Sequence, residues 1–152
     1  MTVSAGDHAP DFVAETTEGQ RSLDDLLSTG PLVLVFYSED STPACTTQVS
    51  SFRDEYDTLR DLGTSVLAVS ADTLASHERF AGQIGPLPFP LAADPDLALA
   101  RAYDVVDEEG KRSRRAVFVI GQDGIVIEAV QHYQPGVMDQ FASVFRALGL
   151  DL

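Results

Sequence analysis

Cysteine is nearly absent from this sequence of 152 residues, in which Cys45 is the only one. A single cysteine excludes a disulfide bond within the chain. Cys45 is therefore an inert buried thiol, a reactive thiol, or one half of a bond to another molecule. Composition alone does not choose among these three, so the surroundings of Cys45 have to be considered.

Lysine is equally scarce, because Lys111 is the only one, and 24 acidic residues stand against 10 basic ones, for a formal net charge of −14. A field of this sign disfavours binding to nucleic acid and to anionic membrane surfaces. The acidic residues are spread along the chain, which predicts a uniformly acidic and well-hydrated surface. With so little lysine, the composition resembles proteins of salt-loving organisms, in which salt screens the self-repulsion.

Long apolar runs are also missing. None approaches the roughly 20 residues that a membrane helix needs, and residues 1–7 lack the charged and apolar blocks of a signal peptide. We therefore expect a soluble, cytoplasmic protein with no membrane partner. The length and the 44% of hydrophobic residues suffice for one compact domain over residues 1–152, without disulfides or metal.

Apolar segments predict the strands of this domain. Residues 32–37 form an apolar run without alternation, rich in β-branched and aromatic side chains, and residues 66–70 form a similar run. Such runs are typical of strands that are covered on both faces. Two shorter β-prone pieces are expected at residues 12–14 and 89–92.

Helices are predicted between these strands. Ser22 and Asp25 have the spacing of a capping box, which predicts a short helix over residues 22–27. After the second run, Asp72 or Thr73 is expected to cap a helix that ends near Gly85. One long amphipathic helix of about five turns is predicted from apolar residues three or four apart. These residues are Val49, Phe52, Tyr56, Leu59 and Leu62.

The second half of the chain predicts two helices and a hairpin. Asp94 and Pro95 are expected to start one helix, because proline favours the first turn. Residues 116–120 and 125–130 flank a turn that contains Asp-Gly, which predicts an antiparallel β-hairpin. A last amphipathic helix follows from residue 137 onward.

The order of these elements predicts an α/β fold. Parallel strands come early and an antiparallel pair comes late, which fits a thioredoxin-like three-layer sandwich with a mixed central sheet and helices on both faces. Ligand sites in open α/β sheets lie beyond the carboxyl ends of the strands. The segment 37–45, which contains the cysteine, falls at that edge.

Cys45 itself is predicted to lie in the first turn of the long helix. Thr42 or Ser41 can cap that helix, and Pro43 suits its first position. Free backbone N–H groups and the helix dipole stabilise a thiolate there, which lowers the pKa of a cysteine. Because Cys45 also continues the apolar stripe of the helix, it is expected at the rim of the core. The local sequence leaves both an inert packing residue and a reactive thiol open.

The segment Thr42-Pro43-Ala44-Cys45 resembles the Thr-Pro-x-Cys signature of the peroxiredoxins, in particular the bacterioferritin comigratory protein type. The resemblance covers nearly the whole chain in the order of that family. Residues 6–12 resemble its opening, residues 52–54 its helix, residues 91–95 its middle segment and residues 115–120 its arginine-led strand.

This resemblance implies a role for four residues. Cys45 would be the peroxidatic cysteine, whose thiolate attacks a hydroperoxide and becomes a sulfenic acid. Thr42 would orient the peroxide, and Pro43 would shield the thiolate from bulk water. Arg115 would stabilise the thiolate and the charge on the departing oxygen. Arg114 competes with Arg115 for this role, and the spacing to Phe118 favours Arg115. The resemblance implies no metal and no organic cofactor.

The chain departs from that family at three positions. Many relatives carry a resolving cysteine where this chain has Ser50, so the resemblance implies a one-cysteine cycle that needs an external thiol reductant. This reductant would be a small thiol or a thioredoxin-like or glutaredoxin-like protein, and the enzyme a monomer or homodimer. Ser38 stands where proline is usual, and we expect it to alter the rigidity of the loop without removing a catalytic group. Gly121 replaces a common aspartate in the hairpin turn.

Other functions fit the sequence less well. A thiol-disulfide oxidoreductase needs a Cys-x-x-Cys pair, which is absent. A cysteine hydrolase needs a histidine near Cys45, and His77 is interpreted instead as a packing residue. No histidine spacing indicates a metal site. The alternative that remains open is a non-enzymatic redox sensor or relay that uses the sulfenic acid of Cys45 to oxidise a partner protein.

Overall fold

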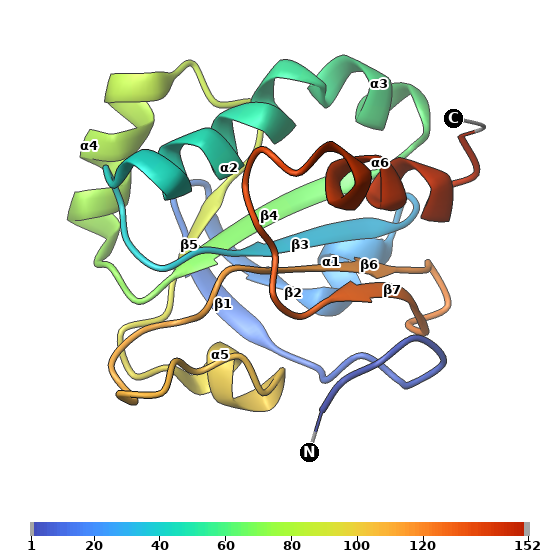
Figure 1. The fold of residues 1–152 in the computed structure, drawn as a ribbon, viewed down its shortest axis with the longest axis horizontal. Helices are drawn as coiled ribbons and strands as arrows, with labels where there is room; N and C mark the ends of the chain where they lie inside the picture. The colour runs from blue at the N-terminus through green and yellow to red at the C-terminus, as the bar shows by residue number, and fades with distance from the viewer. Residues whose placement is uncertain (1, 151–152) are drawn as a thin grey trace.

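The computed structural model describes residues 2–150, so Met1, Asp151 and Leu152, at the ends of the expected domain, lie outside the described residues. Within the described residues, seven strands form one sheet in the order β2-β1-β5-β4-β3-β6-β7 (Figure 1). Their bounds are β1 Val13–Thr16, β2 Gly19–Ser22, β3 Leu32–Phe36, β4 Ser65–Ser70, β5 Leu91–Ala93, β6 Ala116–Ile120 and β7 Val126–Val130.

The helices lie between and after these strands. None of those in residues 2–150 has the length and hydrophobicity that crossing a membrane requires. Their bounds are α1 Leu23–Leu27, α2 Pro43–Asp54, α3 Tyr56–Asp61, α4 Leu74–Ile84, α5 Ala98–Ala102 and α6 Met138–Ala147.

The sheet is mixed, as the sequence predicts. Strand β4 runs parallel to both β3 and β5, whereas β6 is antiparallel to β3 and to β7. The antiparallel hairpin β1–β2 extends the sheet beyond β5. The expected β6–β7 hairpin is confirmed, and Gly124 takes a φ of 84° in its turn, a conformation that glycine adopts without steric cost.

Two apolar clusters cover the two faces of the sheet, because successive side chains of a strand point to opposite faces. From β3, Leu34 and Phe36 join the cluster that includes side chains of α1 and α5. Val33 and Val35 join the cluster that includes side chains of α2, α3, α4 and α6. In Figure 1 these last four helices lie together on one side of the sheet and α5 lies on the other. The predicted thioredoxin-like sandwich of three layers is therefore confirmed.

The prediction of one helix of about five turns after the cysteine is wrong. Helix α2 ends at Asp54 and α3 begins at Tyr56, because Glu55 departs from helical geometry with φ −101° and ψ 13°. The apolar side chains of Phe52 and Leu59 are both fully buried on either side of this break. Their spacing keeps its period across Glu55, so the sequence pattern alone could not reveal the interruption.

The start of α5 also differs from the prediction. Pro95 lies before the helix, which begins at Ala98 after Leu97, a residue with a left-handed φ of 62°. The Asp94 carboxylate accepts hydrogen bonds from the backbone N–H groups of Leu99 and Ala100, both at 3.0 Å. Asp94 therefore caps the helix through its side chain from outside the first turn, which moves the helix start downstream.

Candidate active site

Cys45 lies in the first turn of α2, as the sequence predicts. Pro43 is the first residue of this helix, and the Thr46 N–H donates to the Thr42 carbonyl at 2.8 Å. The Cys45 side chain is only 1% exposed and packs in the same cluster as Val49. The thiol is thus held at a helix N-terminus and at the inner side of the loop that follows β3, where free backbone N–H groups favour negative charge.

Ser38 makes two polar contacts with the sulfur of Cys45. The Ser38 N–H donates to Sγ at 3.4 Å, and the Ser38 hydroxyl lies 3.5 Å from Sγ. Burial is the largest single effect on this thiol and raises its pKa. Hydrogen bonds from the side chains of Ser38 and Thr42, and from the backbone of Glu39 and Ser38, outweigh burial, so the pKa of Cys45 is lowered from its ordinary value. The arrangement therefore favours the reactive thiolate over an inert thiol.

Thr42 precedes the helix as predicted, but its hydroxyl does not cap it. The hydroxyl donates to the Glu39 carbonyl at 3.1 Å, and Thr42 makes no side-chain cap bond. Ser41, the other expected cap, has a φ of 66° and donates its hydroxyl to Gln83 Oε1. Thr42 is therefore the N-cap residue, as one of the two alternatives predicts, but it makes no side-chain cap bond, and Ser41 does not cap the helix. Pro43 is exposed at the helix start.

Arg115 and Ser38 line the same polar pocket, which has a volume of about 440 Å³. The Nε atom of Arg115 is buried and has no hydrogen-bond partner within residues 2–150. The Nε atom of Arg114 is buried without a partner within these residues as well, but the terminal nitrogens of Arg114 donate to the backbone carbonyls of Asp104 and Val106. The other residues that line the pocket are Asp107, Arg112, Ser113, Arg114, His132, Tyr133 and Gln134.

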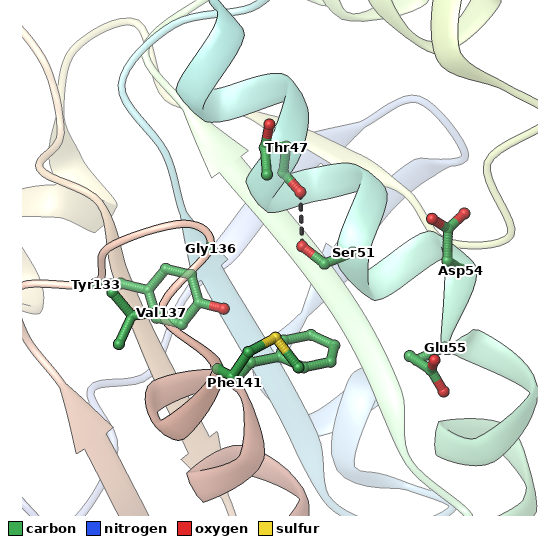
Figure 2. A pocket seen from close by; sticks show the side chains of 9 residues that line it. Thr47, Ser51, Asp54, Glu55, Tyr133, Gly136, Val137 and Phe141 are labelled. Carbon is green, nitrogen blue, oxygen red and sulfur yellow. Dashed lines mark hydrogen bonds between the residues drawn. The ribbon is translucent and has the colours of Figure 1, made fainter.

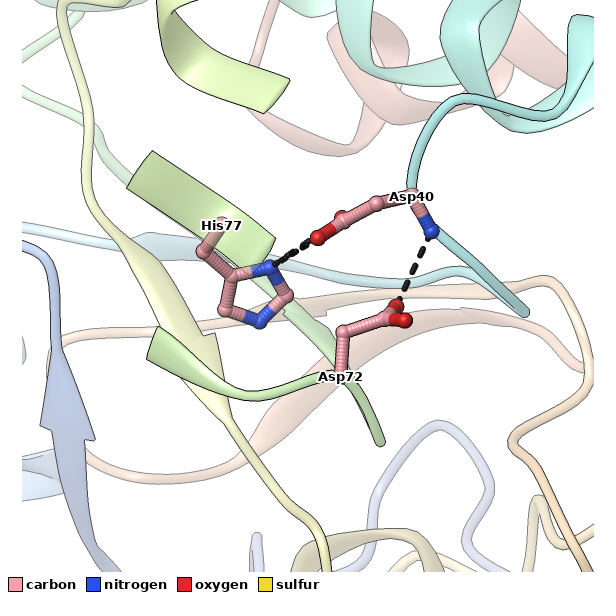
Figure 3. A group of neighbouring side chains, drawn as sticks. All are labelled: Asp40, Asp72 and His77. Carbon is pink, nitrogen blue, oxygen red and sulfur yellow. Dashed lines mark hydrogen bonds and ion pairs between the residues drawn. The ribbon is translucent and has the colours of Figure 1, made fainter. Parts of the chain in front are cut away.

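A buried polar network lies beside the loop between β3 and α2, and the local sequence does not reveal it (Figure 3). The Tyr37 hydroxyl donates to Asp40 Oδ1 at 2.6 Å, and His77 Nδ1 lies 2.8 Å from Asp40 Oδ2. His77 Nε2 bonds to the Ala92 carbonyl at 2.9 Å. The interpretation of His77 as a packing residue is confirmed, because it is fully buried and both ring nitrogens have partners other than Cys45.

Asp40, Asp72 and His77 are also the residues of the described chain whose ligand atoms come close enough to hold a cation, within 4.8 Å of one another. Their atoms are already bonded within the protein, since Asp72 Oδ2 accepts from the Asp40 N–H and from the Ser70 hydroxyl. The donors around this cluster already stabilise its carboxylates. The geometry is therefore that of a hydrogen-bond network which holds the loop.

A second pocket of about 300 Å³ lies between α2 and the segment that leads into α6 (Figure 2). Cys45 is not among its lining residues, whereas Tyr133 lines both this pocket and the polar one. No sequence motif indicates this pocket, because segments about 90 residues apart along the chain form it. It is lined by Thr47, Ser51, Asp54, Glu55, Tyr133, Gly136, Val137, Met138 and Phe141.

A thioredoxin-like sheet that holds a buried, hydrogen-bonded thiol at a helix start is an arrangement suited to a thiol-dependent peroxidase. Comparison with known proteins agrees. The sequence matches the AhpC/TSA family over residues 5–129, so the chain belongs to this family, that of the peroxiredoxins.

Three known proteins illustrate the relationship. The chain is 35% identical over 136 residues to a chloroplastic 2-cysteine peroxiredoxin of Chattonella marina var. antiqua, covering 83% of this chain and 69% of the relative. It is also 35% identical over 133 residues to a putative peroxiredoxin bcp of Coxiella burnetii, covering 83% and 87%. The crystal structure of the peroxidoxin BcpB from Mycobacterium tuberculosis superposes with a TM-score of 0.83 at 30% identity, covering 97% of this chain and 95% of that one.

Proposed function

We propose that this peroxiredoxin reduces hydrogen peroxide or organic hydroperoxides by a one-cysteine cycle in which Cys45 alone carries the redox change. The observation that supports the proposal most directly is the Cys45 sulfur, held at the start of α2 by two donors from Ser38 that favour its thiolate. No second thiol exists in the chain to complete the cycle.

The first step oxidises the sulfur. The thiolate attacks one peroxide oxygen, so that an S–O bond forms while the O–O bond breaks, and the second oxygen takes a proton and leaves as water or an alcohol. Thr42 orients the peroxide and Arg115 stabilises the charge on the departing oxygen. Pro43 fixes the loop and limits access of bulk water to the thiolate.

The second step needs thiols from outside the chain. One thiol attacks the sulfenic acid and displaces water, which leaves a mixed disulfide on Cys45, and a further thiol then releases Cys45 and carries away the disulfide. Ser50, in α2, cannot take this role because a hydroxyl does not form a disulfide. The external reductant is a thioredoxin-like or glutaredoxin-like protein or a small thiol. The chain acts as one domain, as a monomer or homodimer, in the cytoplasm, where such thiols are kept reduced.

A peroxidase assay tests this cycle. The protein is mixed with hydrogen peroxide or an organic hydroperoxide and excess dithiol, and peroxide consumption is compared with that of Cys45→Ser. We expect many turnovers from the native chain and none from the variant, while Ser50→Ala serves as the matched control and keeps its rate. Stoichiometric oxidation of Cys45 without turnover contradicts the peroxidase and favours a redox sensor. An unchanged mass of Cys45 after peroxide treatment contradicts both.

A further inference from the structure

Ser38 connects the thiol to the polar pocket. It lines the pocket together with Arg115 and also contacts the Cys45 sulfur, whereas Cys45 is not among the lining residues. The position follows from the fold, because β3 ends at Phe36 and the chain turns over the start of α2 immediately afterwards. A peroxide that enters through this pocket therefore meets Ser38 beside the sulfur.

We propose that Ser38 is a further catalytic residue, whose N–H and hydroxyl together hold the Cys45 sulfur as a thiolate, with Ser38 between the sulfur and the polar pocket. The proposal rests on the proposed function for its place in a peroxidase cycle, and it adds a residue that the family resemblance did not assign. A proline at this position would offer the sulfur neither donor, since it has no N–H and no hydroxyl.

The chemistry of the two groups supports this role. A thiolate has no proton, so the Ser38 hydroxyl, 3.5 Å away, acts as donor once Cys45 ionises, and the backbone N–H is a donor in either state. Within residues 2–150 this hydroxyl has no other hydrogen-bond partner that would hold its proton elsewhere. Two donors on one charged sulfur stabilise the ionised form over the neutral one.

The charge of the chain makes such uncharged donors useful. A net charge of −14 disfavours a further negative charge anywhere on the molecule. Arg112, one of the pocket's cations, is paired with Glu39 at 3.2 Å, and Arg114 bonds to backbone carbonyls. Hydrogen bonds from Ser38 act at contact distance on a buried sulfur, so salt screens them much less than it screens the charges of the acidic surface.

Substitutions at Ser38 separate the two donors. Ser38→Ala removes the hydroxyl and keeps the N–H, Ser38→Pro removes both, and Ser38→Thr keeps both. The thiol pKa is measured in each variant from the pH dependence of Cys45 alkylation by iodoacetamide, and the rate of oxidation by hydrogen peroxide is measured in parallel. Ser51→Ala is the matched control, because its hydroxyl bonds only to carbonyls of α2.

We expect a graded result. At a pH below the thiol pKa of every variant, Ser38→Ala lowers the alkylation rate about tenfold, and Ser38→Pro lowers it further, because donors to a charged group are lost. At a pH where all variants are fully ionised, the rates converge. Ser38→Thr and Ser51→Ala follow the native profile, and the shift caused by Ser38→Ala is the same at low and high salt.

A structural role for Ser38 would give a different outcome. If Ser38→Ala and Ser38→Pro fold but keep the native pH profile, the proposal is wrong, and if Ser38→Pro does not fold, the comparison of Ser38→Ala with Ser38→Thr decides. The alkylation profile needs no peroxide turnover. A shifted profile in a protein without turnover would therefore reject the proposed function alone, and turnover with an unshifted profile would reject only the role of Ser38.

Discussion

His77 Nδ1 lies 2.8 Å from Asp40 Oδ2, and both side chains are almost completely buried. Asp40 belongs to the loop between β3 and α2, the helix that carries Cys45. Asp40 also accepts hydrogen bonds from the hydroxyls of Tyr37 and Ser76. A single carboxylate therefore joins the end of β3 to helix α4. Because low dielectric strengthens such a network when every member is bonded, it fixes the loop between β3 and α2, which contacts the Cys45 sulfur through Ser38.

Removal of the Asp40 carboxylate should destabilise the protein strongly. Asp40→Ala leaves the buried polar atoms of Tyr37 and His77 without this partner, and we expect a loss of about 3 kcal/mol in the free energy of unfolding. Urea denaturation measures this loss. Asp139→Ala is the matched control, since Asp139 pairs with Arg146 on the surface, where an ion pair contributes little. Equal losses from the two variants would contradict the structural role of the network.

The same carboxylate should make stability depend on pH. Burial, the largest effect, raises the pKa of Asp40, but hydrogen bonds from His77, Tyr37 and Ser76 outweigh it, so the pKa is lowered. A carboxyl whose pKa is lower in the folded state stabilises the fold above its unfolded pKa of about 3.9, and this contribution disappears as the pH falls through the folded pKa. We expect the stability difference between the native protein and Asp40→Asn to be constant from pH 6 to about 5, and to shrink below about pH 4. If the stability difference between the native protein and Asp40→Asn grew as the pH fell, this prediction would be contradicted.

Structural elements that are fixed by contacts between residues close in sequence could be predicted from the sequence. Ser22 and Asp25 exchange both bonds of the expected capping box, and each partner is three residues from the other. The break at Glu55 was not predictable, because the apolar period continues across it. The start of α5 depends on Asp94 reaching N–H groups five and six residues ahead, which a local cap rule does not consider.

The features of the candidate site likewise differ in whether the local sequence predicts them. The position of Cys45 at a helix start follows from Thr42 and Pro43 beside it, and the structure places it there. The bond between His77 and Asp40 joins residues 37 apart in sequence, so it exists only once α4 packs against the sheet. Ser38 is seven residues from Cys45, and its contact with the sulfur requires the turn between β3 and α2. From the sequence alone, Ser38 therefore stands out only as a departure from the proline that is usual at this position in the family.

The cap at Asp94 gives a prediction for α5. Asp94→Ala leaves the buried N–H groups of Leu99 and Ala100 without their acceptor, and we expect a loss of about 1 to 2 kcal/mol in the free energy of unfolding. Asp96→Ala is the control, because Asp96 accepts one exposed bond from the Ala98 N–H. Chemical denaturation of the two variants should show the larger loss for Asp94→Ala. The opposite order would mean that α5 is capped by its nearest acid instead.

Arg115 and Arg114 differ in what their guanidinium groups contact, and this difference predicts which one serves the reaction. Both arginines line the pocket beside Ser38, and each has a buried Nε without a partner within residues 2–150. The terminal nitrogens of Arg114, however, are held by the carbonyls of Asp104 and Val106, and no such bonds hold those of Arg115 within residues 2–150. We expect Arg115→Ala to slow oxidation of Cys45 by hydrogen peroxide on the order of a hundredfold, as for loss of one charge-stabilising donor. Stopped-flow measurement of the second-order rate constant tests this.

Two further variants make the test of Arg115 specific. Arg115→Lys keeps the positive charge but not the planar fork of donors, so its rate should lie between those of the native protein and Arg115→Ala. Arg114→Ala loses bonds to the backbone, so we expect it to lower the thermal unfolding temperature. We expect its rate constant for oxidation of Cys45 to stay close to that of the native protein. If Arg114→Ala instead reproduces the hundredfold loss while Arg115→Ala reacts normally, the assignment belongs to the neighbouring arginine, and the free Nε of Arg115 has no part in the chemistry.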